Sequence, residues 1–195
     1  MRLPNAAHEA RPWVIDDVAR DFRLLDVWAL PVEGEREEFG RALEVLVGSF
    51  DPSRSPLPAR ALFAVRRALG TVLRWDEERE RPIPGARETT LSARLPESLK
   101  GSAANGPTIR EGGFRPLYLT DDEWAAEISN DTVHGVLHVG WVGIGGGRHR
   151  AQLAVYVKTR GRLGEVYLRL IEPFRHLVVY PALMRQAGRA WEAQR

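Results

Sequence analysis

The apolar positions along the chain change their spacing several times, and each change predicts a different element. Residues 22–30 form a dense run of aromatic and branched side chains that ends at Pro31, which predicts a first strand. Residues 14–20, just before this run, predict a short helical turn. Residues 35–50 carry apolar side chains on one stripe and begin with acidic residues, which predicts an amphipathic helix.

The middle of the chain predicts a linker, a second helix and a long irregular segment. Residues 51–58 are rich in Pro and Ser, and residues 59–75 again place apolar side chains at helical spacing. Residues 76–113 are rich in charge, Pro, Gly and Ser. We therefore expect a long irregular loop over 76–113 that is partly mobile, most of all over 100–113.

The strongest strand patterns follow this loop. Residues 114–119, 132–142 and 151–159 each predict a strand, and the Gly-rich residues 143–147 predict a hairpin between the last two. Residues 120–129 are ambiguous. Thr120 and Glu123 have the spacing of a helix capping box, whereas Asn130 and Asp131 favour a tight turn between two strands.

The chain ends in a long amphipathic pattern over residues 163–191. Pro173 and Pro181 interrupt it, and each would cost about 3 kcal/mol in a straight helix, so we expect this helix to be bent or divided there. The elements run in the order strand, two helices, loop, antiparallel strands, long helix. This order predicts a single α+β domain over residues 1–195 and, without βαβ alternation, argues against a doubly wound sheet.

Composition indicates which partners and which location to expect for this domain. The chain has 195 residues and a net charge of +2, with acidic and basic residues interleaved rather than gathered in a basic stripe, so we expect no nucleic-acid partner. The longest clean apolar run, residues 177–184, is far shorter than the roughly 20 residues that cross a membrane. We expect a soluble, cytoplasmic protein, and the marked preference for Arg over Lys is typical of a GC-rich bacterial genome.

Known catalytic and cofactor motifs do not appear in the sequence. The chain has no cysteine and no GxSxG motif, and the Gly-rich residues 143–147 precede a strand, whereas phosphate-binding loops precede a helix. His134 and His138 have a metal-site spacing only on a helix, since a strand separates them by about 13 Å. We expect no catalytic residue, no cofactor and no metal site.

Several segments carry a resemblance to a known family. They are residues 162–164 (Arg-Leu-Gly), 167–168 (Tyr-Leu), 171–176 (Ile-Glu-Pro-Phe-Arg-His) and 127–139. With the order of the elements, they resemble an uncharacterised bacterial family of the START-like superfamily, also called SRPBCC or helix-grip, which includes polyketide cyclases. The resemblance implies a curved antiparallel sheet packed on a long, kinked C-terminal helix, with an apolar cavity between them, and it favours a strand over 120–129.

The leading functional hypothesis is therefore the binding of an apolar or amphipathic small molecule, lipid-like or polyketide-like. The candidate lining residues are Leu137, Val139, Trp141, Leu153, Val155, Tyr167, Leu170, Phe174 and Val178. The candidate polar anchors are His134, His138, Arg175 and His176. Two alternatives stay open: a cyclase or isomerase that uses a buried His or Tyr in the same cavity, and a protein-interaction module whose cavity is collapsed. A second copy of the chain is a further candidate partner.

Overall fold

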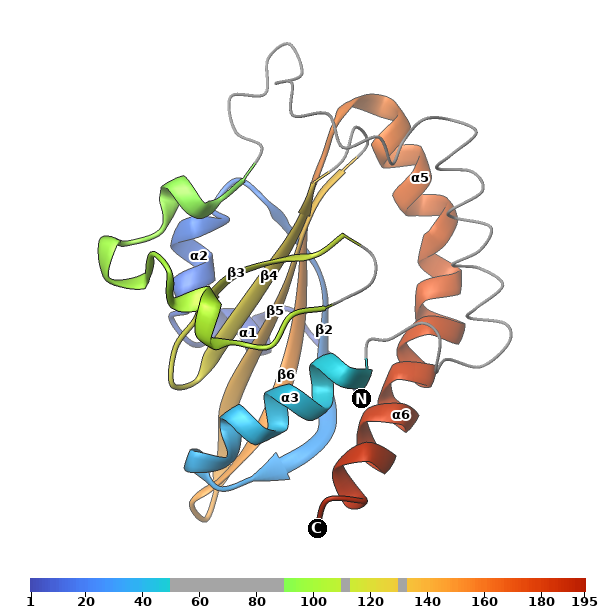
Figure 1. Cartoon of the computed structure of the whole chain (residues 1–195). Coiled ribbons are helices and arrows are strands. Elements are labelled where there is room, and N and C mark those ends of the chain that lie inside the picture. The colour runs from blue at the N-terminus through green and yellow to red at the C-terminus, as the bar shows by residue number, and fades with distance from the viewer. Residues whose placement is uncertain (50–89, 110–112, 130–132) are drawn as a thin grey trace.

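The computed structural model of the chain describes residues 1–49, 90–109, 113–129 and 133–195. Six strands in these residues form one antiparallel sheet in the order β1-β2-β6-β5-β4-β3 (Figure 1). The strands are β1 (Arg2–Leu3), β2 (Arg23–Gly34), β3 (Arg115–Leu119), β4 (Glu123–Ser129), β5 (Val133–Gly145) and β6 (Arg148–Thr159). With the helices described below, the predicted α+β class is confirmed.

Two tight connections fix the register of the later strands. β5 and β6 meet at Gly145, Gly146 and Gly147, which have φ angles of 96°, 59° and 76°, a region that favours glycine, so the predicted hairpin is confirmed. Between β3 and β4, the backbone N–H groups of Asp122 and Glu123 donate to Thr120 Oγ1. The residues that also suit a helix start thus form a hairpin turn, and β4 is a strand.

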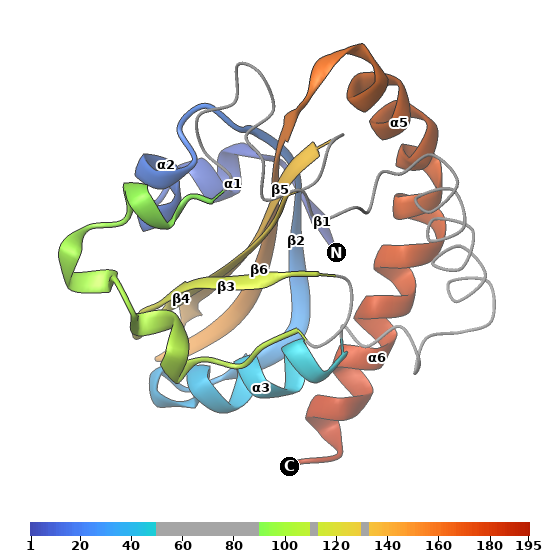
Figure 2. The same ribbon diagram turned by 45° about the horizontal axis from the view of Figure 1, so that its top comes forward.

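Each face of the sheet is covered by a different part of the chain (Figure 2). One face, which we call the helix face, packs against α3 (Phe39–Ser49) and against the C-terminal helix, which consists of α5 (Gly161–Phe174), the π-helical segment η6 (Arg175–Val179) and α6 (Tyr180–Glu192). The other, which we call the N-terminal face, is covered by α1 (Ala6–Glu9), α2 (Val14–Val18) and the short 3-10 turns η3 (Ser92–Arg94) and η4 (Glu97–Leu99). The turn η1 (Arg36–Glu38) precedes α3, and the turn η5 (Ser102–Asn105) lies beside β3.

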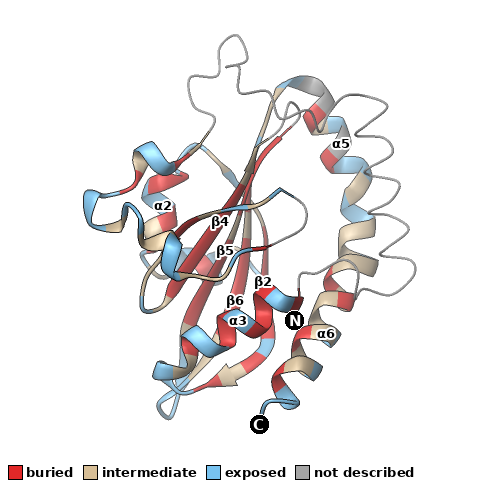
Figure 3. Ribbon diagram, in the orientation of Figure 1, coloured by how far each residue is buried: buried red, intermediate tan, exposed pale blue. Residues whose placement is uncertain are grey.

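Both faces carry a core of their own. On the helix face, Trp28, Leu153 and Trp141 pack with the apolar sides of α3 and α6, whereas on the N-terminal face Val27 and Ala154 pack with α2. Buried residues accordingly fill the strands, while α5 carries mostly intermediate and exposed residues (Figure 3). The two-sided sheet explains why its central strands lack a strict apolar–polar alternation.

The predicted C-terminal helix is confirmed, but α5 continues through Pro173, and the departure from α-helical geometry comes after it. In η6, which follows two residues later, the N–H of Tyr180 donates to the carbonyl of Arg175, five residues back, so this turn is wider than an α-helical turn. Pro181 lies in the first turn of α6, a position that suits a residue without an N–H group.

The first strand is longer than predicted. β2 continues through Pro31 to Gly34, although the sequence predicts its end at Pro31. Its neighbour β1 pairs only with Val27 and Trp28, and the pairing with β6 shifts register between Ala29 and Glu33, so Pro31 meets no ladder that needs its missing donor.

The predicted linker 51–58, the second helix 59–75 and the first part of the predicted loop, 76–89, lie outside the described residues. Residues 110–112 of that loop also lie outside the described residues, whereas 90–109 form three short 3-10 turns and bury Leu91, Leu95 and Ile109. Within the described residues no helix is both long and apolar enough to cross a membrane.

Candidate functional site

Three clusters of buried polar side chains stand out among the described residues. Two lie on the N-terminal face, where they connect the sheet to α1, α2 and the turn that begins at Thr90. The third lies on the helix face, where it connects β2 to the C-terminal helix around Asp26.

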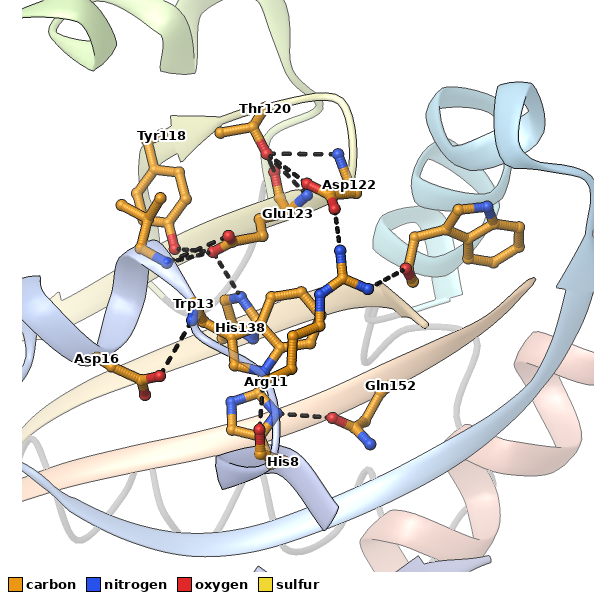
Figure 4. Close-up of polar contacts among 12 residues, drawn as sticks. His8, Arg11, Trp13, Asp16, Tyr118, Thr120, Asp122, Glu123, His138 and Gln152 are labelled. Atoms are coloured by element: carbon orange, nitrogen blue, oxygen red, sulfur yellow. Dashed lines mark hydrogen bonds and ion pairs between the residues drawn. The ribbon is translucent and has the colours of Figure 1, made fainter. Parts of the chain in front are cut away.

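The first cluster, which we call the His8 network, joins the N-terminal segment to the central strands (Figure 4). His8 Nδ1 lies 2.6 Å from Gln152 Oε1 and His8 Nε2 lies 2.9 Å from Tyr156 Oη, while the Tyr156 hydroxyl also donates to Asp16 Oδ1 at 3.0 Å. The ring of His8 stacks on Trp13, which in turn packs edge-on against His138.

Glu123 of β4 forms the second half of this network. Its carboxylate accepts hydrogen bonds from the backbone N–H of Val14 and from the Tyr118 hydroxyl, and it lies 3.2 Å from His138 Nε2. Burial alone would raise the pKa of Glu123, but the hydrogen bond to His138 and the other donors outweigh it and lower that pKa. The carboxylate is therefore ionised within a closed set of donors.

The His8 network is suited to holding structure rather than to turning over a substrate. Burial, with a smaller contribution from His138, lowers the pKa of His8 to about 4, so the ring is neutral at neutral pH. His8 and His138 are both completely buried, and Arg11 closes the end of the network by pairing with Asp122 and stacking over Trp13. The network fastens the first 20 residues to the sheet.

The second cluster is smaller and fastens the chain near Thr90. Glu127 of β4 lies 2.8 Å from His134 Nε2, and it accepts hydrogen bonds from the Thr90 hydroxyl and the backbone N–H of Leu91. Burial opposes ionisation of Glu127, but these contacts, led by His134, lower its pKa. His134 and His138 thus both pair with carboxylates of the neighbouring strand, on the face turned away from the C-terminal helix.

The third cluster, which we call the Asp26 cluster, lies on the helix face. Asp26 is only 1% exposed, and its carboxylate accepts hydrogen bonds from Arg175 Nη2 at 2.7 Å and from the Tyr180 hydroxyl at 3.0 Å. His176 Nε2 lies 2.7 Å from the other carboxylate oxygen, and Arg2 approaches to 3.6 Å. Burial, then the charge of Asp26, raises the pKa of Tyr180 well above its usual range, which keeps this hydroxyl protonated.

The wide turn of η6 explains how three residues of one helix reach a single carboxylate. On an α-helix, residues five apart point to different sides, whereas a π turn places them one above the other. The hydrogen bond from the N–H of Tyr180 to the carbonyl of Arg175 therefore aligns these two side chains over Asp26. The π turn of η6 and the Asp26 cluster belong to one structural feature.

The structure brings some of the predicted lining residues together and separates others. Leu137 and Val155 are half-buried on the helix face, whereas Val139, Trp141 and Leu153 are at most 1% exposed in the closed core. Phe174 and Val178 are half-buried, Leu170 is 73% exposed and points outward, and the side chain of Tyr167 lies outside the described residues. Of the predicted polar anchors, Arg175 and His176 lie on the helix face with the apolar lining, and His134 and His138 do not.

The sequence patterns did not point to Asp26, the common partner in the helix-face cluster, or to His8, Glu123 and Glu127. A signal for Asp26 was available, because a carboxylate in the middle of an apolar strand needs a buried partner. Glu123 and Glu127 share the four-residue spacing of His134 and His138, which fits cross-strand pairs on adjacent strands. Among the described residues no group of three or more side chains could hold a metal ion.

Comparison with known families gives one match. Residues 18–182 match the model of a family described as "Protein of unknown function (DUF2867)", so the match covers most of the chain. No curated protein and no solved structure matches the chain. The function must therefore be argued from the site itself.

Proposed function

The chain belongs to the DUF2867 family, and we propose that it binds an apolar or amphipathic small molecule between its sheet and its C-terminal helix. One observation carries this proposal. Leu137 and Val155 occupy the middle of the sheet on the helix face and yet remain half-buried.

Two neighbouring rows of side chains cross the helix face, and they differ in how well they are covered. The Trp28 row consists of Trp28, Leu153, Val139 and Trp124. These side chains are at most 9% exposed and belong to the core closed by α3 and α6. The Asp26 row consists of Asp26, Val155, Leu137 and Ala126. Its two central side chains, Val155 and Leu137, remain partly open.

Incomplete burial of Val155 and Leu137 lowers the stability of the folded protein unless a bound molecule covers them. β5 and β6 are the central strands, and each Å² of apolar surface left in water forfeits about 25 cal/mol. The next row holds Gly135 opposite Val157, and Ile128 of β4 packs where a side chain at Gly135 would lie, so the incomplete burial is confined to the Asp26 row. An apolar molecule lying on Val155 and Leu137 would remove this surface from water.

The C-terminal helix offers a matching apolar side. Ile171, Phe174 and Val178 are half-buried on α5 and η6, whereas Leu170 is exposed on the outer side. Binding sites for small molecules are mostly apolar with a few polar anchors, and the Asp26 cluster would supply such anchors here. This is the arrangement that the helix-grip resemblance implies, and we extend it to this chain as part of the proposal.

A second candidate function, acid–base catalysis on the bound molecule, draws support from one contact. His176 Nε2 lies 2.7 Å from Asp26, and a carboxylate that orients an imidazole is a common element of catalytic sites. The fully buried His8 and His138 offer no such access. We rank binding first because the other acid–base group beside His176, the Tyr180 hydroxyl, is buried and already donates to Asp26.

The proposal is tested by calorimetric titration with decanoate at neutral pH. We expect saturable binding by the wild type, and Phe174→Ala should weaken it about tenfold, because an aromatic contact of this size is worth at least about 1.4 kcal/mol. Leu170→Ala removes a comparable apolar side chain from the outer side of α5 and should leave the affinity unchanged. A wild type without saturable binding, or an equal loss in both variants, would refute the proposal.

A further inference from the structure

We propose that the Asp26 cluster binds the negatively charged head group of the molecule that lies on the Asp26 row, so that the ligand is an amphipathic acid. This inference rests on the proposed binding function and narrows its ligand class. It follows from the charge balance of the cluster, from two donors that lack acceptors, and from the place of the cluster at one end of the row.

The charge balance of the cluster is positive. One carboxylate, Asp26, faces two guanidinium groups, those of Arg175 at 2.7 Å and Arg2 at 3.6 Å. The remaining partners, His176 and Tyr180, contribute no negative charge at neutral pH. Arg175 is only 17% exposed, and a mostly buried cation that shares its counter-ion favours a further anion nearby.

Two buried donors around the cluster lack acceptors among the described residues. They are the Nε of Arg175 and the indole Nε1 of Trp28. The Trp28 ring lies 4.6 Å from that of Tyr180 and 6.2 Å from that of His176, so Trp28 borders the cluster. An unmade hydrogen bond in a buried place is costly, and an acceptor-rich group such as a carboxylate could satisfy both donors.

The cluster stands at one end of the half-open row. Asp26 pairs with Val155 across β2 and β6, and Val155 pairs with Leu137 across β6 and β5. Adjacent strands lie about 4.8 Å apart, so Leu137 is about 10 Å from the cluster. A chain anchored by its head group at Arg175 would therefore extend over Val155 and Leu137, which suits a medium-length acyl chain.

The test compares decanoate with 1-decanol, which has the same chain and no charge. We expect the wild type to bind decanoate at least about tenfold more tightly, as hydrogen bonds to charged groups imply. Arg175→Gln should abolish this preference, whereas Arg185→Gln, which removes one positive charge from an exposed position of α6, should retain it. Trp28→Phe keeps an aromatic ring and removes the indole N–H donor, so it should reduce the preference about fivefold. It provides a second test that does not depend on the folding of the Arg175 variant.

The outcomes separate the two proposals. Equal affinities for the acid and the alcohol in the wild type would overturn the head-group assignment and leave the binding function standing. A preference that persists in both Arg175→Gln and Trp28→Phe would overturn it as well, since the acid would then be recognised elsewhere. Failure of both compounds to bind would refute the binding function and this inference with it.

Discussion

His8 is the residue whose environment should make the stability of the protein depend most clearly on pH. Its pKa falls from about 6.5 in an unfolded chain to about 4 in the folded one, because burial disfavours the charged ring. Between these values the unfolded chain binds the proton and the folded chain does not. The free energy of unfolding should therefore decrease as the pH falls from about 6.5 to about 4, by up to about 3 kcal/mol.

Urea denaturation at a series of pH values measures this loss. His8→Gln, which keeps a polar side chain beside Gln152 and Tyr156, should flatten the dependence between pH 6.5 and 4. His149→Gln, at the β5–β6 hairpin, is the matched control and should leave it unchanged. Glu123 and Glu127, whose pKa values are lowered, should lose their contribution at lower pH, below about 4.5. An identical pH dependence in the His8 variant and the wild type would contradict the assignment.

Gly140 and Gly143 provide a second test at the scale of single residues. A Cβ atom at Gly140 would lie 2.5 Å from the Trp13 ring, whereas one at Gly143 would meet only the ring of His149, at 3.8 Å. Gly140→Ala should therefore destabilise the protein by about 1–3 kcal/mol by displacing Trp13. Gly143→Ala should have little effect. Equal free energies of unfolding for the two variants would show that Trp13 does not pack on β5 as described.

Trp141 tests the core of the helix face. It is completely buried, and its indole N–H donates to the carbonyl of Glu35 at 3.0 Å. Trp141→Ala should cost about 3–5 kcal/mol in the free energy of unfolding, because the cavity cannot collapse fully. Ile144→Ala, at the 42% exposed hairpin position of the same strand, should cost little. A loss below about 1 kcal/mol for Trp141→Ala would mean that the face assignment is wrong.

At the scale of elements, the sequence predicts helices and hairpins best where a periodic pattern or a glycine cluster is clear. It predicts strand ends and short strands least well, because these depend on pairing with other strands. The stripe over 163–191 predicts the C-terminal helix, and Gly145–Gly147 mark their hairpin. The end of β2 could not be predicted from Pro31, because the cost of Pro in a strand depends on whether a neighbouring strand is present. Thr120 with Glu123 suits a helix start and a strand turn equally well, and only the pairing of β4 with β5 decides between them.

The C-terminal helix should be essential to the fold. Tyr180, Ala187 and Trp191 of α6 are at most 5% exposed and close the core over Trp28 and Leu153. Deleting residues 174–195 would expose this core, so the shortened chain should show no cooperative unfolding transition. Deleting only residues 193–195, which make surface contacts, should preserve the transition. Cooperative unfolding of the longer deletion would contradict the role given to α6.

At the scale of the whole molecule, the candidate site could be predicted only in part. Arg175 and His176 were identified from their place after Pro173, but Asp26, their common partner, is about 150 residues away in the sequence. Amphipathic spacing also could not tell which side of α5 faces the sheet. Leu170 belongs to the predicted stripe and is exposed, because the helix turns Ile171 and Leu168 inward instead.

The outward side of α5 and η6 distinguishes the small-molecule-binding hypothesis from the protein-interaction hypothesis. Val166, Leu170 and Leu177 are 54%, 73% and 77% exposed. A protein-interaction module would use such a surface, whereas a small-molecule binder would use the opposite, inward side over Leu137 and Val155. The two accounts therefore predict responses at different residues of the same molecule.

Methyl-labelled protein titrated with decanoate and followed by NMR is the most direct test of the central claim. The account predicts saturable shifts at the methyl groups of Leu137 and Val155, which belong to the Asp26 row, and of Ile171, on the half-buried side of α5. Val136, the neighbour of Leu137 on the N-terminal face, and Leu170, on the outer side of α5, should not respond. Shifts confined to Leu170 and Leu177, shifts at Val136 equal to those at Leu137, or no saturable shift at all would contradict binding between the sheet and the C-terminal helix.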